Sequence, residues 1–458
     1  MGVTRTLATF VTETNFDQIP SEGISTAKDL ILDTIGVALA ASVIPTGQIA
    51  IRYVQELKAS PFSSVIGGRL KTYPPEAAFC NGLLAHALEY DDSWPETIHP
   101  SSMVFSAALA VAEYCGRSGR ELIEAYLVGL EVLAKIRNAA GNITHTQGWH
   151  GSSVYGALGS AAAAAKLLQL DIRQTCRALS IAASGASGLG RQIGFMAKPY
   201  QQGNAARQGV LAALLARSGF TADENIVEGR EGFMAVFHEE GQYVLGKIVE
   251  GLGRPFHIVK PGVSIRKYPC PMVFQGPIDT LLDIMKRSGA SYEDVEEVVV
   301  TITPRQLVRY DTPHPATGEQ AKFSLNFVLA TALRHGKVNP KSFADQEVDK
   351  PEMKEAIGKI RLTSLPPEEL SKIADPARYQ PWIALRLRDG RQFSHHLDYP
   401  RGRYDDPTPK IEYVLPKFRE NAKAVLSSGN VDRCITLVQQ LETLESLESL
   451  AELIRNES

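Results

Sequence analysis

GSAAAAAKLLQL, at residues 159–170, points most directly to the fold, because it joins strong helix formers to a run of small side chains. Small residues let neighbouring helices approach closely, so such a run is typical of a helix inside a bundle. The stretch ISTAKDLILDTIGVALAA, at 24–41, places aliphatic side chains along one helical stripe. We therefore predict a buried bundle, with helices over residues 24–41, 76–90, 101–115, 120–138, 152–169, 172–186 and 203–218.

The sequence changes character near residue 260. EEVVVTITP, at 296–304, is β-branched and ends in proline, which predicts a strand. WIALRLRDGRQFSHHLDY, at 382–399, has two alternating runs joined by Asp389-Gly390, a strong hairpin signal. Helices are expected over 321–335 and 351–359, and leucines and isoleucines at helical spacing return towards the C-terminus.

These patterns predict a mainly α protein with an α+β second domain. We expect a large helical domain over 1–262, completed by C-terminal helices in 404–458, and a smaller α+β lid domain over 263–403. The Pro-rich stretch at 398–409 makes a return linker. A chain of 458 residues exceeds the size at which one core keeps growing, which agrees with two domains.

Charge and composition exclude several classes of function. The formal net charge of -3 argues against a nucleic-acid partner. No apolar run reaches the ~20 residues that cross a bilayer, so no membrane partner is expected. The five cysteines contain no C-x-x-C pair, which favours a reducing, cytoplasmic setting over a disulfide framework and leaves a mitochondrial one open. The spacing in GASGLGRQIG does not match a dinucleotide-binding loop.

The first candidate for chemistry is a polar cluster at residues 86–102, where a helix is expected to end. Histidines beside acids suit acid–base catalysis, whereas the alternative is a capped turn in which Asp92 or Ser93 bonds backbone amides. A metal site is disfavoured, because no H-E-x-x-H or comparable spacing is present. The cluster contains His86, Glu89, Asp91, Asp92, Ser93, Glu96, Thr97 and His99.

Three further segments place polar residues beside expected helix starts or the domain junction. His150 directly precedes a helix whose amides favour an anion, although a histidine there is more often structural. Lys198 precedes Pro199, so we expect extended backbone there and a helix that opens near residue 203. Arg266 and Lys267 lie at the junction, where ligand sites are common, and a solvated charge pair is the alternative.

Taken in order, these segments resemble the MmgE/PrpD family over nearly the whole chain. The resemblance implies a helical domain plus an α+β lid domain, a homodimer, and chemistry without a cofactor or metal. It runs through LDTIGVALAAS, AAFCNGLLAHALEYDD, HPSS, GWHGSSVYGALGSAAAAAKLL, KPYQQGNAARQGVLAALLA, EGREGFMAVF, KYPCP and AKFSLNFVLATAL.

Carried over residue by residue, the resemblance implies His99, His150 and Lys198 as catalytic residues. It also implies a set of substrate-binding residues: Glu89, Asp92, Ser93, Arg266, Lys267 and Cys270. Ser93 stands where relatives commonly have threonine, and Glu89 where aspartate is usual. Larger departures are Pro271 and Gln275 in place of histidines and Phe327 in place of the decarboxylases' tyrosine.

The resemblance implies a lyase acting on a small polycarboxylate. One of His99 and His150 would act as general base and the other as general acid, and Lys198 with Arg266 or Lys267 would neutralise carboxylates. Glu89 or Asp92 would orient a histidine. Dehydration of a 2-methylcitrate-like or alkylcitrate-like acid is the leading expectation. Epimerisation of a dicarboxylate such as iminodisuccinate, decarboxylation of cis-aconitate, and a non-catalytic carboxylate-binding homologue are the alternatives.

Overall fold

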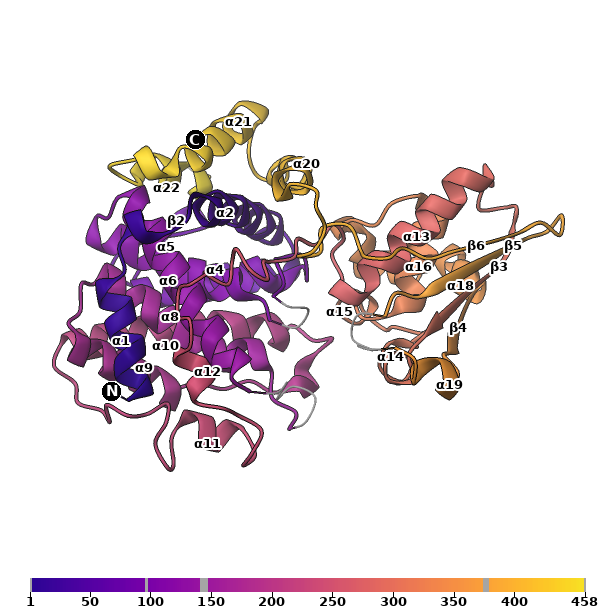
Figure 1. The fold of residues 1–458 in the computed structure, drawn as a ribbon. Coiled ribbons are helices and arrows are strands. Elements are labelled where there is room, and N and C mark those ends of the chain that lie inside the picture. The colour runs from indigo at the N-terminus through magenta and orange to yellow at the C-terminus, as the bar shows by residue number, and fades with distance from the viewer. Residues whose placement is uncertain (1, 95–97, 141–146, 374–378, 457–458) are drawn as a thin grey trace. The chain divides into compact units, whose positions relative to one another are not determined.

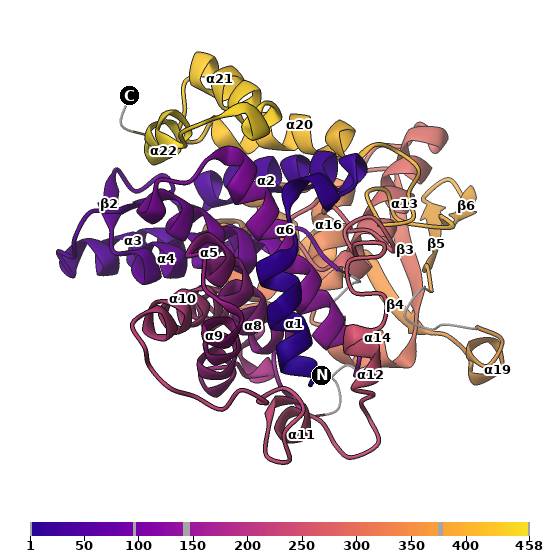
Figure 2. The same ribbon diagram turned by 60° about the vertical axis from the view of Figure 1, so that its left-hand side comes forward.

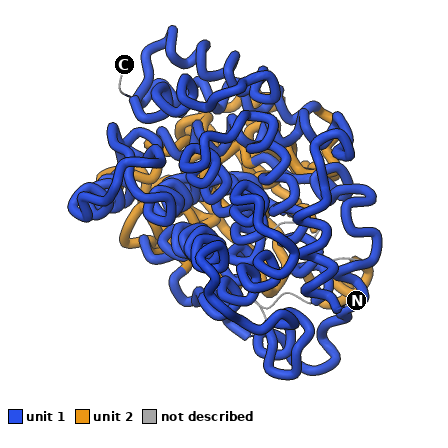
Figure 3. The backbone as a smooth tube through the Cα atoms, turned by 90° about the vertical axis from the view of Figure 1, so that its left-hand side faces the viewer, with its two compact units in different colours: residues 1–192, 196–265, 409–458 blue, residues 193–195, 266–408 orange. Residues whose placement is uncertain are grey.

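The computed structural model describes residues 2–94, 98–140, 147–373 and 379–456. The chain divides into two compact units, which are coloured separately in Figure 3. Unit 1 comprises residues 1–192, 196–265 and 409–458, and unit 2 comprises residues 193–195 and 266–408. Each unit is described by itself.

Unit 1 is built from helices and one short two-stranded ribbon (Figure 1). The ribbon pairs β1 (Ser63–Val65) with β2 (Leu70–Thr72) in antiparallel register. The helices before residue 265 are α1 (Val3–Glu13), α2 (Ser21–Ala41), α3 (Pro45–Glu56), α4 (Pro74–Ala87), α5 (Pro100–Cys115), α6 (Gly119–Asn138), α8 (Gly151–Leu167), α9 (Ile172–Ser184), α10 (Ala197–Arg217), α11 (Phe233–Phe237) and α12 (Gly246–Val249).

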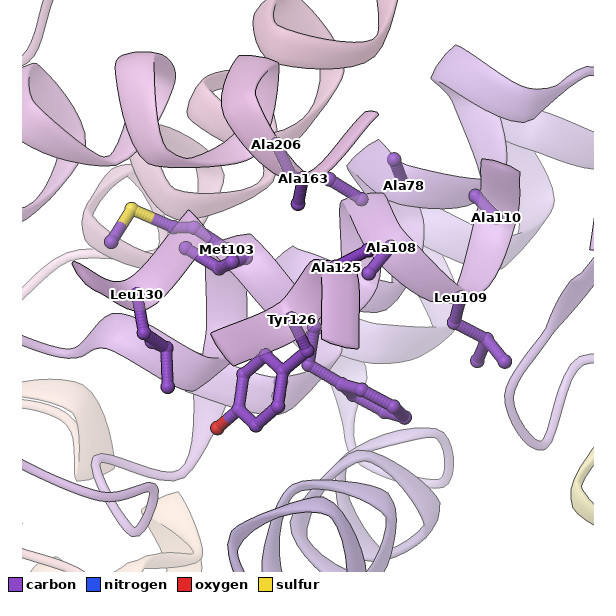
Figure 4. Close-up of a cluster of buried hydrophobic side chains, with 14 of the residues drawn as sticks. Ala78, Met103, Ala108, Leu109, Ala110, Ala125, Tyr126, Leu130, Ala163 and Ala206 are labelled. Atoms are coloured by element: carbon purple, nitrogen blue, oxygen red, sulfur yellow. The ribbon is translucent and has the colours of Figure 1, made fainter. Parts of the chain in front are cut away.

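Small side chains let the central helices of unit 1 pack closely. Helices α4, α5, α6, α8 and α10 contact one another, and alanines such as Ala108, Ala125 and Ala163 lie between them (Figure 4). A Cβ added at Gly159 would lie 2.9 Å from the carbonyl oxygen of Gly129, so α6 and α8 could not approach this closely with larger residues there. The alanine-rich stretch of α8 is therefore bundle core.

The C-terminal helices belong to unit 1, although they follow unit 2 in the sequence. They are α20 (Lys410–Ala422), α21 (Ser428–Gln439) and α22 (Glu448–Arg455). In Figures 1 and 2 they lie beside α2, and both α20 and α21 contact that helix. The chain thus returns to its first helices after unit 2.

Unit 2 is a four-stranded mixed sheet packed with helices. The strand order is β4-β3-β5-β6, with β3 parallel to β4 and antiparallel to β5. A buried aliphatic and aromatic core joins α13, α16 and α18 to the sheet. The elements are α13 (Met272–Ser288), β3 (Val295–Ile302), α14 (Pro304–Tyr310), α15 (Gly318–Ala321), α16 (Leu325–His335), α17 (Asp345–Val348), α18 (Pro351–Gly358), β4 (Ile360–Ser364), α19 (Pro367–Leu370), β5 (Trp382–Leu387) and β6 (Gln392–His395).

The predicted fold class, a mainly α protein with an α+β second part, is confirmed. The predicted strand at 296–304 corresponds to β3, and the Asp389-Gly390 turn joins β5 to β6 with Gly390 at φ 88°. Four helix boundaries differ from the predicted ones by three residues or more. Helix α10 begins at Ala197 rather than near residue 203, and α16 begins at Leu325 rather than at residue 321. Helix α2 begins at Ser21 rather than at residue 24, and α4 ends at Ala87 rather than at residue 90, so Glu89 lies beyond it. The parallel strand β4 was not predicted.

Among the described residues, no single helix is both long and apolar enough to cross a membrane. One pair, α2 and α3, passes that test only when its two helices are taken together, and they are bent by 90°.

Candidate active site

The candidate site forms where α4 ends against the first turn of α10. A Cβ added at Gly82 of α4 would lie 3.1 Å from the Cα of Gly203, and a Cβ at Gly203 would collide with the carbonyl oxygen of Phe79. Glycine is therefore required at residue 203, and the lack of a side chain at Gly82 lets the two backbones lie close together. This approach brings His86, near the end of α4, against Lys198, near the start of α10.

Lys198 is a buried cation inside a helix. Its ammonium donates to the carboxylate of Glu89 and lies 2.6 Å from Nε2 of His86. The prediction that Lys198 precedes its helix is wrong, because α10 already includes it. Pro199 is tolerated there, since an amide in the first turn of a helix has no intrahelical acceptor.

Glu89 has a left-handed backbone conformation, with φ 52°. Such a conformation costs a non-glycine residue about 1 kcal/mol, and here the amide of Glu89 donates to the carbonyl of His86 at 3.0 Å. The side chain is buried. Its two carboxylate oxygens lie 3.5 Å from Nε2 of His86 and 3.8 Å from Nε2 of His99. Glu89 therefore stands among both histidines and Lys198.

His99 precedes α5 and is anchored through Nδ1. That nitrogen lies 3.2 Å from the carbonyl oxygen of Asp92, which can only accept, so Nδ1 carries a proton. It also lies 3.7 Å from the carboxylate of Asp91. The ring stands 4.4 Å from the ring of His86, and the backbone amide donates to Ser152 at the start of α8.

His150 precedes α8 and is anchored in the same way by a glutamine. Nδ1 of His150 lies 2.5 Å from Oε1 of Gln201, whose amide nitrogen donates to the carbonyl of Leu189 at 3.0 Å. That second bond fixes the glutamine oxygen towards the imidazole, so Nδ1 of His150 carries the proton and Nε2 the lone pair. Burial, and then the charge on Lys198, lower the pKa of His150 to about 3. The imidazole is therefore neutral at neutral pH.

The remaining predicted residues of unit 1 lie beside this group in different roles. Asp92 accepts from the hydroxyl of Ser101 at 2.7 Å and from its backbone amide at 3.3 Å. Burial, and then the charge on Asp91, raise the pKa of Asp92 to about 8. Ser93 forms a two-way backbone bridge with Ser264, and its hydroxyl is buried without a hydrogen-bond partner among the described residues. Glu96 and Thr97 lie outside the described residues.

The predicted residues of unit 2 have partners of their own. Nζ of Lys267 pairs with the buried carboxylate of Asp279 at 2.6 Å. Arg266 and Cys270 are buried, and the sulfur of Cys270 lies 3.4 Å from the amide nitrogen of Gln275. That glutamine also accepts from the backbone amides of residues 267 and 268 and donates to the carbonyls of residues 268 and 270. Its amide thus fixes the loop before α13.

The other two departures from the relatives, Pro271 and Phe327, both lie in unit 2. Pro271 occupies the position just before α13, and Phe327 of α16 is fully buried, with its ring 5.9 Å from that of Phe343. Phe327 therefore forms part of the core of unit 2.

His86, Asp91 and Gln201 complete the site and were given no role from the sequence. His86 and Asp91 appeared in the polar cluster but were not selected, and Gln201 was not singled out. The spacing offered one signal, because Gln201 follows Lys198 by three residues, which places both on one helix face.

Among the residues that the structure describes, one group offers three candidate metal ligands within 4.8 Å of one another: His86, Asp91 and His99. The Nδ1 of His86 lies 2.9 Å from the carboxylate of Asp91, a hydrogen-bond distance, and the Nδ1 of His99 faces the carbonyl of Asp92. Metal ligation through either Nδ1 requires its deprotonation. The observed contacts therefore fit protonated Nδ1 atoms rather than a metal centre.

Known proteins resemble this chain along its full length. It is 29% identical to the human cis-aconitate decarboxylase over 469 residues, covering 100% of this chain and 95% of that relative. It is 28% identical to the mouse enzyme, covering 100% and 94%, and 28% identical to the cis-aconitate decarboxylase of Aspergillus terreus, covering 99% and 96%. Residues 5–245 match the MmgE/PrpD N-terminal domain, and residues 268–443 match the MmgE/PrpD C-terminal domain. The chain therefore belongs to the MmgE/PrpD family.

Proposed function

We propose that this protein is a lyase that acts on a small polycarboxylate by histidine acid–base chemistry without a metal. Dehydration of a 2-methylcitrate-like or alkylcitrate-like acid is the leading reaction. The observation that carries the proposal is that His99 and His150 are both anchored through Nδ1, next to a buried Lys198. Nε2 of each ring is then the nitrogen left to exchange protons.

His150 is the proposed general base. Its imidazole is neutral with the lone pair on Nε2, the form that removes a proton from a carbon next to a carboxylate. A polyanionic substrate bound beside the ring raises its affinity for that proton. The charge that spreads into the carboxylate is stabilised by the ammonium of Lys198.

His99 is the proposed general acid. The carboxylates of Glu89 and Asp91 lie 3.8 and 3.7 Å from its ring nitrogens, and nearby negative charge favours an imidazolium. The imidazolium gives its proton to the departing hydroxyl, which leaves as water while the carbon–carbon double bond forms. The buried hydroxyl of Ser93 is proposed to contact the substrate. Substrate contacts from Glu89, Asp92, Arg266, Lys267 and Cys270 stay predictions.

Decarboxylation of cis-aconitate is a second candidate, because the similar relatives named above carry out that reaction. The departures at Pro271 and Phe327 weigh against it. Neither side chain can donate the proton that a decarboxylated carbanion needs, whereas a histidine and a tyrosine could. Lys198 and the two histidines suit both reactions, since both pass through a stabilised carbanion.

The test is proton NMR of the purified protein in deuterated water with 2-methylcitrate, citrate, cis-aconitate and iminodisuccinate, with and without EDTA. We expect water loss from a citrate-type acid at the same rate in EDTA. His99→Ala and His150→Ala should each lower turnover by about 10²- to 10⁴-fold, as for other general acid–base groups. His314→Ala, at an exposed histidine of unit 2, is the matched control and should keep full turnover.

Other outcomes distinguish the alternatives. Deuterium uptake without elimination would favour an epimerase, and carbon dioxide release from cis-aconitate would favour a decarboxylase. Loss of activity in EDTA would contradict the metal-free chemistry. The absence of any reaction with all four acids would contradict the lyase proposal and favour a carboxylate-binding homologue.

We also propose that the protein is a homodimer, on the resemblance to its family. Light scattering coupled to size exclusion would give about twice the chain mass of 49.9 kDa. A monomer at micromolar concentration would contradict this.

A further inference from the structure

A buried chain of polar groups lies beside the two proposed catalytic histidines, with the ring of His86 4.4 Å from that of His99 and 6.3 Å from that of His150. The carboxylate of Asp91 lies 2.9 and 3.0 Å from Nδ1 of His86, and Nε2 of His86 lies 2.6 Å from Nζ of Lys198. The side chains of His86 and Asp91 are fully buried. The proposed proton transfers give His86 no role and use only the charge of Asp91, beside His99.

The position of one proton decides how this chain works. An ionised carboxylate only accepts hydrogen bonds, so Asp91 requires the proton of His86 on Nδ1. The lone pair is then on Nε2, where it can accept from the ammonium of Lys198. With the proton on Nε2 instead, two donors would face each other at 2.6 Å. Asp91 thus determines whether His86 attracts or repels the lysine.

We propose that Asp91 and His86 are positioning residues, which aim the ammonium of Lys198 by holding His86 as the neutral Nδ1–H tautomer. This inference rests on the proposed function for its link to catalysis, but its structural content concerns only these three residues. Glu89 supplies a counter-charge for the lysine, and His86 supplies an acceptor of fixed direction. The close approach of α4 to α10 at Gly82 and Gly203 keeps donor and acceptor within reach.

The direct test is nitrogen-15 NMR of protein labelled in its histidine rings, at pH 7.5. The resonances of His86 are identified by their loss in His86→Gln, or by the proximity of its ring to that of His99 if that variant does not fold. We expect a protonated Nδ1 and an unprotonated Nε2. A proton on Nε2, or on both nitrogens, would overturn the proposal.

A second test separates positioning from packing. The amide oxygen of His86→Gln can still accept from Lys198, whereas His86→Leu fills the space without an acceptor. We expect kcat/KM on the acid that the wild type turns over to fall about 10- to 100-fold in the leucine variant, as for other residues that orient a catalytic group. The glutamine variant should recover part of that loss. Equal activity of the two variants would overturn the positioning role.

The two tests keep this inference distinct from the proposed function. The NMR measurement needs no turnover. If the protein turned over none of the acids but held His86 as the Nδ1–H tautomer, the lyase proposal would be contradicted and the proposed role of Asp91 and His86 supported. An active lyase with the proton of His86 on Nε2 would support the proposed function and contradict the positioning role of Asp91 and His86.

Discussion

Asp92 illustrates how burial sets the charge of one carboxyl group. Its side chain is enclosed beside Asp91, and its pKa is raised to about 8. The folded protein therefore keeps a proton there at neutral pH. The carboxyl accepts from the hydroxyl of Ser101, which also contacts the hydroxyl of Tyr126. In the unfolded chain the same group has its ordinary pKa of 3.8 and is ionised.

A pH dependence follows from this difference. Between pH 3.8 and about 8 the folded state binds one proton more than the unfolded state at Asp92. The stability that this group contributes thus falls as the pH rises through that window, by up to about 1.4 kcal/mol per pH unit. Asp92→Asn is neutral in both states and lacks this slope. We expect the variant to gain on the wild type in urea midpoint from pH 5 to 8, and the difference to level off above pH 8.

The matched control is Asp398→Asn, because the Asp398 side chain is 91% exposed. That variant should follow the wild type at every pH. If Asp92→Asn instead lost stability relative to the wild type as the pH rose, Asp92 would be ionised in the folded protein.

At the scale of single elements, the sequence predicted what local pattern determines. Apolar periodicity and alanine content placed the helices of the bundle, and an Asp-Gly pair placed the turn between β5 and β6. The strand β4 was not predicted, because it is five residues long and pairs with β3 across about sixty residues of chain. The early start of α10 was missed because the residue before a proline usually avoids helical backbone. Here Lys198 precedes Pro199 and is nevertheless helical, in the first turn of α10.

The candidate site follows the same division. His150 was placed before a helix from local sequence, and the structure has it there. The pairs that give the site its chemistry join distant residues: His86 with Lys198, and His150 with Gln201. Such pairs depend on which helices pack together, and the local patterns of a sequence do not show that.

Helix α20 supports the site through one buried lysine. Nζ of Lys417 pairs with the buried carboxylate of Asp33 in α2 at 2.7 Å and donates to the carbonyl of Tyr90 at 2.5 Å. Tyr90 directly follows Glu89, so Lys417 connects the C-terminal helix α20 to the segment after α4 that carries Glu89. Lys417→Met leaves a buried carboxylate without its counter-charge, which costs about 3–5 kcal/mol. We expect a large fall in urea midpoint and a loss of turnover.

The control for this prediction is Lys423→Met, at an exposed lysine beside the end of α20, which should change little. The double variant Asp33→Asn with Lys417→Met should be more stable than Lys417→Met alone, because it no longer buries an uncompensated charge. If the two substitutions were simply additive in their cost, the pair would not be the source of the effect.

At the scale of the whole molecule, the protein has two separate hydrophobic cores. One includes residues from Leu7 to Ile454 and lies in unit 1, and the other includes residues from Cys270 to Leu387 and lies in unit 2. A unit with its own core can fold alone. The site residues of unit 1 also find the partners described above within that unit, namely Gln201 for His150, Asp91 for His86 and Asp33 for Lys417.

This organisation predicts that unit 1 is an independent folding unit. A variant that replaces residues 266–408 with a flexible Gly/Ser linker joins Ile265 to Pro409 and keeps every residue of the first core. We expect a helical far-UV circular dichroism spectrum, one cooperative thermal transition, and the same Nδ1–H tautomer at His86 as in the full chain. We expect turnover to be lost, because the variant lacks Arg266, Lys267 and Cys270, which are predicted to contact the substrate. A variant that also lacks 409–458 is the contrasting control, and it should melt without cooperativity, since it loses Lys417 and the helices that cover α2. A non-cooperative melt of the first variant would mean that unit 1 needs unit 2 to fold.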